Sequence, residues 1–130
     1  MPPRCLLDTP TLLWMAGDVD RLSDTARQTL ADPTTHLVIS VASVWEIAAQ
    51  LGAGQLRLDL PLTELIRSAT AQTGIALLPV ELPHTLVVPT LPLHHHDLFD
   101  RLLVAQCMVE DLVIVSDDAA FDAYPVKRLW

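Results

Sequence analysis

Four carboxylates stand far apart in the chain, each next to apolar sequence: Asp8, Glu46, Asp100 and Asp118. Carboxylates that are packed together repel one another, and the repulsion raises their pKa values unless a cation offsets it. Oxygen ligands without cysteine favour Mg²⁺ or Mn²⁺ over Zn²⁺. These residue types therefore indicate a divalent-cation site, provided that the fold brings the four acids together.

Most of these acids also have a purely structural explanation. Asp8 and Asp118 each precede a short stretch with helical or turn character, and Asp is a favoured N-cap residue. Asp97 and Asp100 suit the first turn of a helix, where negative charge interacts well with the helix dipole. Single positions do not separate these interpretations, so it is the joint placement of the acids that favours a common site.

Glu46 is the least easily explained by local structure. The segment Ser43–Glu46 matches a capping box, in which Ser and Glu cap the same helix end. However, the helix is expected to begin nearer Ser40, which places Glu46 in its second turn between two apolar residues. An acid on the packed face of a helix needs a partner or a ligand, which again favours a site.

Apolar runs alternate with amphipathic stretches along the chain. The runs predict strands at 4–7, 36–39, 75–78 and 112–115, with a fifth edge strand at 126–129. Helices are expected over 9–15, 24–30, 40–51, 62–73 and 97–110, with one short helix within 81–93. Continuous apolar strands that alternate with helices are typical of a parallel sheet buried on both faces. We expect an α/β fold of three layers, α/β/α, with a mainly parallel sheet of four to five strands.

This arrangement would bring the acids to one edge of the sheet. Ligands of open parallel sheets bind beyond the carboxyl ends of the strands. Asp8 ends the first strand, and residues 117–118 end the fourth. Glu46 lies in the helix after the second strand, and residues 97–100 begin the helix that leads into the fourth.

Length and charge restrict the class of protein. A chain of 130 residues that is 51% hydrophobic suits one folded domain, 1–130. The formal net charge of −8 argues against RNA binding through a basic stripe. It does not exclude a nuclease, because cations held by carboxylates create local positive charge where a phosphate must sit. The acidity also fits a basic protein partner.

The sequence predicts a cytoplasmic protein without a membrane segment. No apolar run reaches the roughly 20 residues that cross a bilayer, and the N-terminal residues lack the features of a signal peptide. Cys5 and Cys107 lie in apolar surroundings, so two reduced, buried thiols are expected rather than a disulfide or a metal knuckle.

Two further groups of residues leave alternatives open. The consecutive residues His94–His96 point in different directions in a loop, so a polar loop is favoured over a zinc site, whose ligands are normally spaced. Trp14, Met15 and Trp45 would form either an exposed apolar patch or part of the core, and their helical spacing favours the core.

Four segments, taken in order, resemble the PIN domain of bacterial VapC-type toxins. They are Cys5-Leu6-Leu7-Asp8-Thr9, the run from Ser40 to Ala48, the run from Leu93 to Leu103, and the run from Val115 to Phe121. The resemblance extends over essentially the whole chain. Its specific parts are Ser-Val-Trp-Glu-Ile-Ala at 43–48 and His-x-Asp-x-Phe-Asp-Arg-Leu-Leu at 95–103.

The resemblance implies a metal-dependent endoribonuclease that uses Mg²⁺, with Mn²⁺ as the alternative, to hydrolyse RNA. It further implies a homodimer that a cognate basic antitoxin holds inactive. By position, the family's four acids correspond to Asp8, Glu46, Asp100 and Asp118, as both catalytic residues and metal ligands. Further positions match the family with less defined roles: Asp97, Arg101 and Ser116.

The fourth acid is ambiguous, because Asp117 and Asp118 are adjacent. Asp118 is preferred because Phe121 follows it at the family's spacing. The family often has Pro where Leu98 stands, a departure that is expected to matter little.

Three other functions remain as alternatives. The chain could be a PIN-type RNA-processing nuclease that is not a toxin. A receiver-like signalling domain would need an acid after the middle strand, where Leu77-Leu78-Pro79 stands, and a Lys directly after the fourth strand, where Ser116 stands. A non-catalytic interaction domain is disfavoured because all four acids are present.

Overall fold

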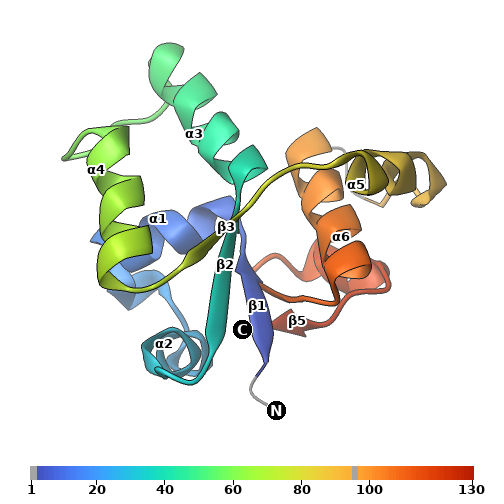
Figure 1. Ribbon diagram of the computed structural model, residues 1–130, viewed down its shortest axis with the longest axis horizontal. Coiled ribbons are helices and arrows are strands. Elements are labelled where there is room, and N and C mark those ends of the chain that lie inside the picture. Colours follow the sequence, from blue (N-terminus) through green and yellow to red (C-terminus); the bar gives the residue numbers. More distant parts are fainter. Residues whose placement is uncertain (1–2, 95–96) are drawn as a thin grey trace.

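A computed structural model describes residues 3–94 and 97–130 (Figure 1). The strands are β1 (Arg4–Leu7), β2 (His36–Ser40), β3 (Ala76–Leu78), β4 (Val113–Val115) and β5 (Arg128–Leu129). The α-helices are α1 (Thr9–Gly17), α2 (Asp24–Ala31), α3 (Val41–Gly52), α4 (Leu62–Arg67), α5 (Leu82–Val87) and α6 (Leu98–Glu110). The short helices are η1 (Val19–Arg21), η2 (Ser68–Gln72, a π-helix), η3 (Val88–Thr90) and η4 (Ala119–Ala123).

The described strands form one sheet in the order β3-β2-β1-β4-β5. Every pairing between neighbours is parallel, which confirms the predicted α/β fold. β1 lies in the middle, between β2 and β4. The carboxyl end of β1 therefore lies beside the carboxyl ends of β2 and β4, since Leu7 pairs with both Ile39 and Val115.

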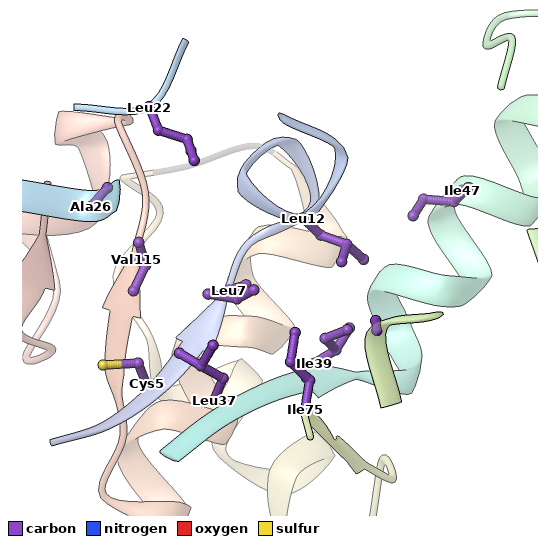
Figure 2. Packing of buried hydrophobic residues seen from close by; sticks show 11 residues of the cluster. Cys5, Leu7, Leu12, Leu22, Ala26, Leu37, Ile39, Ile47, Ile75 and Val115 are labelled. Carbon is purple, nitrogen blue, oxygen red and sulfur yellow. The ribbon is translucent and has the colours of Figure 1, made fainter. Parts of the chain in front are cut away.

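Helices cover both faces of the sheet, with α1, α2 and α4 on one side and α5 and α6 on the other (Figure 1). Successive strand residues point to opposite faces, so Leu7 packs toward α1 while Leu6 packs toward α6. Figure 2 shows the first of these clusters, in which Leu7 and Ile39 gather with Leu12 of α1 and Ile47 of α3. Each fully buried Leu of this kind contributes roughly 1.5–3 kcal/mol.

Polar residues begin the helices where the sequence predicts. The Ser23 hydroxyl accepts from the Ala26 N–H at 3.0 Å at the start of α2, and the Ser40 hydroxyl accepts from the Ala42 N–H at 3.0 Å at the start of α3. Ser43 lies buried inside α3, so the capping-box interpretation of Ser43 and Glu46 is wrong.

Some expected features differ in detail. The edge strand β5 is shorter than the expected 126–129, and the expected helix 62–73 changes to a π-helix at Ser68. The core interpretation fails for Trp45, whose residue surface is 66% exposed, whereas Trp14 packs against the core and meets Trp130 with ring centroids 5.9 Å apart. Of the helices in the described residues, none is long and apolar enough to cross a membrane.

Candidate metal centre

Asp8 stands at the carboxyl end of β1 and is both a helix cap and a buried acid. Its side chain accepts from the Thr11 N–H at 2.9 Å, which caps α1, and only 3% of the residue is exposed. Burial raises the pKa of Asp8, hydrogen bonds from Ser116 and Thr11 lower it, and the negative charge of Asp117 raises it further. The expectation that Asp8 caps a helix is thus correct. It does not explain why Asp8 is buried, because a capping side chain can remain exposed to solvent.

Two hydrogen bonds to one backbone carbonyl fix the segment around Asp8 relative to β4. The Asp8 N–H donates to the Val115 carbonyl at 3.2 Å, and the Thr11 hydroxyl donates to the same carbonyl at 3.0 Å. The end of β1, the start of α1 and the end of β4 are therefore held together by one carbonyl oxygen.

Glu46 lies half-buried on α3 and faces the same region. Burial is the largest cause of its raised pKa, and the negative charges of Asp97 and Asp8 add to the rise. The hydroxyl of Thr9 opposes part of it, yet this buried oxygen has no partner within hydrogen-bonding geometry. The charges of Asp8 and Asp97 therefore both act on Glu46, although the sequence separates these residues widely.

Asp97 and Asp100 begin α6. The Asp97 side chain accepts from the N–H groups of Phe99 at 2.8 Å and Asp100 at 3.3 Å, so Asp97 is the N-cap that precedes α6 and not, as expected, a residue of its first turn. Asp100 follows in the first turn and is partly buried. Because Asp97 caps the turn that carries Asp100, the position of Asp100 depends on the segment that leads into α6.

The segment after β4 carries the remaining acids. Ser116 is fully buried, and its hydroxyl accepts from the Asp118 N–H at 3.0 Å. The Asp118 side chain accepts from the Ala120 N–H at 2.9 Å and caps η4, as the sequence suggests. Asp117 is exposed but raises the pKa of Asp8, so both members of the adjacent pair belong to this edge of the sheet.

The acids do not form a preassembled ligand shell. Within the ranges 3–94 and 97–130, no group of three or more His, Cys, Asp or Glu side chains is placed so that it could hold a metal ion. Mutual repulsion favours such separation when no cation is bound. The donor chemistry nevertheless fits a hard cation: the candidate ligands are carboxylate oxygens, two of them carry poorly compensated charge, and the Thr9 hydroxyl beside them lacks a partner.

An open groove runs past this region. It has a volume of about 580 Å³ and is lined by Glu46, Gln50, Asp97, Leu98 and Phe99, among others. A larger hollow of about 850 Å³ lies at the amino ends of the strands, near Arg4 and His36. None of the four predicted acids lines it, so its size does not make it the site.

The family is settled by the sequence as a whole. The sequence pattern of the PIN domain matches residues 5–127. The chain belongs to the PIN domain family. Among curated proteins, none matches the sequence of this PIN domain.

Solved structures resemble this PIN domain over nearly its whole length. VapBC2 from Rickettsia felis, bound to a DNA fragment from its promoter, gives a TM-score of 0.72 at 12% identity over 97% of this chain and 98% of that one. FitAcB from Neisseria gonorrhoeae gives 0.63 at 17% identity over 95% of each chain. A toxin-antitoxin complex from Klebsiella pneumoniae gives 0.58 at 17% identity over 93% and 92%. At such identities these similarities establish the fold.

The sequence did not single out Thr9 or Thr11 in the PIN domain as part of the site. Thr11 orients Asp8, and Thr9 lies against Glu46. The signals were that both follow the first acid within three positions, which also fits ordinary helix starts, and that Thr9 belongs to the first segment that resembles the family. The possible zinc site at His94–His96 falls partly outside the described residues, because His95 and His96 are not among them. His94 contacts the ring of Tyr124 with centroids 5.3 Å apart.

Proposed function

We propose that this PIN domain is a divalent-cation-dependent endoribonuclease whose catalytic residues and metal ligands are Asp8, Glu46, Asp100 and Asp118. The observation that carries the proposal is the buried Asp8 at the carboxyl end of the central strand: burial and the charge of Asp117 raise its pKa, and its own charge raises the pKa of half-buried Glu46. Charge that is costly to the fold without a counterion is explained if a cation is bound during function.

Asp8 and Asp100 would hold Mg²⁺ directly, with Glu46 and Asp118 completing the set through oxygen or water; Mn²⁺ is the alternative ion. When bound, the cation would supply Lewis-acid activation of water and would offset charge that develops on the phosphate. The net charge of −8 repels RNA, which is a polyanion. A bound cation would therefore be needed to attract the phosphate to the site.

Hydrogen bonds within the chain orient the proposed ligands. Thr11 and Ser116 hydrogen-bond Asp8 and limit its rotation. The Asp97 cap fixes the first turn of α6, which carries Asp100. In the hydrolysis, a water oxygen bonds to phosphorus as the bond to the 3′ oxygen breaks. The products are a 5′-phosphate and a 3′-hydroxyl, which takes up the proton lost by water.

The test is cleavage of single-stranded RNA by the purified chain, with Mg²⁺ or with EDTA. We expect cleavage only with the cation, new 5′-phosphate ends, and a loss of about 10²-fold or more in Asp8→Asn and Asp100→Asn. Asp59→Asn, an exposed acid with the same change in charge, is the matched control and should cleave normally. Equal cleavage by wild type, Asp8→Asn and Asp100→Asn would remove the proposal.

We further propose that the nuclease is the toxin of a type II toxin-antitoxin system, cytoplasmic and dimeric, with a basic antitoxin as partner. The support is the similarity in fold to chains from toxin-antitoxin complexes, over 92% or more of those chains. Expression of the chain alone should arrest bacterial growth, and co-expression of a neighbouring small gene should restore it. Normal growth with an active nuclease would favour an RNA-processing PIN enzyme instead.

A further inference from the structure

A buried guanidinium stands directly after Asp100. Only 8% of Arg101 is exposed, and its N–H groups donate to the carbonyls of Pro92 at 2.9 Å, Val88 at 3.1 Å and Leu91 at 3.3 Å. A buried charge is unfavourable unless its donors are satisfied. All three acceptors lie in the segment that enters α6, so this arginine binds the segment that precedes its own helix.

The sequence of that segment explains why an arginine is suited to the task. Pro89 and Pro92 lack an N–H group, which reduces the hydrogen bonds the segment can make with its own carbonyls. The planar guanidinium presents five donors in a fixed geometry, whereas a lysine ammonium would reach fewer of these separated oxygens. The Arg101 side chain therefore supplies hydrogen bonds to carbonyls of this segment.

Tyr124 extends this network to the segment after β4. Its buried hydroxyl accepts from the His94 N–H at 3.1 Å and lies 3.5 Å from Nη1 of Arg101. Its own N–H donates to the Phe121 carbonyl at 3.1 Å and ends η4, the short helix that Asp118 caps. The tyrosine thus contacts the segment before Asp97 and belongs to the segment that follows Asp118.

We propose that Arg101 and Tyr124 are positioning residues that set the place of Asp97 and Asp100 relative to Asp118. Neither residue touches the substrate in this proposal; they act through the backbone that carries the acids. The inference rests on the proposed metal-dependent nuclease and adds two residues to it. A displacement of about 1 Å in a catalytic group can cost on the order of 10²-fold in rate, so a modest loosening of this network has a measurable effect.

Two variants test the network. Tyr124→Phe removes one hydroxyl and keeps the ring, and Arg101→Met keeps much of the length and removes the donors. We expect each to lower RNA cleavage at saturating substrate by roughly tenfold and to weaken Mn²⁺ binding severalfold, as measured by electron paramagnetic resonance on the folded protein. Arg101→Lys should recover part of the loss. Arg67→Met, an exposed arginine paired with Glu64, is the matched control and should behave as wild type.

The Mn²⁺ measurement separates positioning from stability, because a merely structural role lowers the melting temperature without changing the affinity of folded molecules. If Arg101→Met does not fold, Tyr124→Phe decides the matter alone. Folded Tyr124→Phe with wild-type cleavage and wild-type Mn²⁺ affinity would overturn the proposal. Absence of cleavage by the wild type would instead refute the nuclease function itself, while Mn²⁺ affinity would still report on the network.

Discussion

Replacing Asp8 by Asn removes a buried negative charge and keeps an N-cap for α1, since Asn and Asp cap about equally well. Burial raises the pKa of Asp8, so the ionised side chain is less favourable in the folded chain than in the unfolded one. Single stabilising substitutions commonly contribute about 0.5–2 kcal/mol. We therefore expect Asp8→Asn to raise the unfolding free energy of the metal-free protein at pH 7 by an amount of about that size. The melting temperature should rise with it, by roughly 4 °C for each kcal/mol.

The sign of the pH dependence follows from the same shift. Because the folded-state pKa of Asp8 lies above the unfolded value of about 3.9, the wild type binds more protons when folded and gains stability as the pH falls through the folded pKa. Asn does not titrate. The advantage of Asp8→Asn should therefore be largest at neutral pH and should shrink as the pH is lowered toward 4.

Added Mg²⁺ should reverse the order of the two proteins. A ligand at one hundred times its dissociation constant stabilises the folded state by about 2.7 kcal/mol, and this gain depends on the Asp8 charge. Thermal unfolding in EDTA and in Mg²⁺, followed by circular dichroism, measures both effects. Asp59→Asn is again the control for net charge. A lower melting temperature for Asp8→Asn in EDTA at pH 7, or equal Mg²⁺ stabilisation of variant and wild type, would refute the reasoning.

Other predictions follow from burial and exposure. Burial raises the pKa of the Cys107 thiol to about 12, and Cys5 is also buried. Neither thiol should therefore react with iodoacetamide at pH 8 until urea unfolds the chain. Rapid labelling of either thiol in the folded protein would contradict this prediction. His84→Ala should lower the unfolding free energy by about 2–4 kcal/mol, as measured by urea titration. The substitution removes a buried ring whose Nε2 atom lies 3.1 Å from a carboxylate oxygen of Glu110. A change under 1 kcal/mol would contradict this prediction. Trp45→Ser should leave the monomer's unfolding free energy within about 0.5 kcal/mol, since the side chain is largely exposed; a core-like loss would show that it is covered in solution.

The sequence was sufficient for the fold and for the edge of the sheet that holds the acids. Continuous apolar runs at β1, β2 and β4 indicated buried parallel strands, and the structure confirms them. Helix starts were predictable where one residue decides them, as at Ser23 and Ser40. The exposure of Trp45 was not, because helical spacing gives the face of a residue but not what packs on that face.

For the candidate site, the sequence selected residues but did not give their geometry. Spacing and resemblance selected Asp8 and Glu46, and the structure shows that their charges interact. The supporting contacts of Arg101 and Tyr124 depend on carbonyls and a hydroxyl from distant segments, and no local pattern encodes them. The sequence does not show whether the four acids come together around a bound cation, so their assignment as metal ligands stays a prediction.

The pairing of β1 with β4 has a consequence for synthesis on the ribosome. The Thr11 hydroxyl bonds the Val115 carbonyl across 104 positions in the sequence, and the middle strand stays unpaired on one side until β4 exists. Contacts between such remote segments require a long loop to close and form slowly. A growing polypeptide therefore carries Asp8 without its β4 neighbours until the 104 positions from Thr11 to Val115 have been translated. The contacts that hold Asp8 in place thus form long after Asp8 itself has been made.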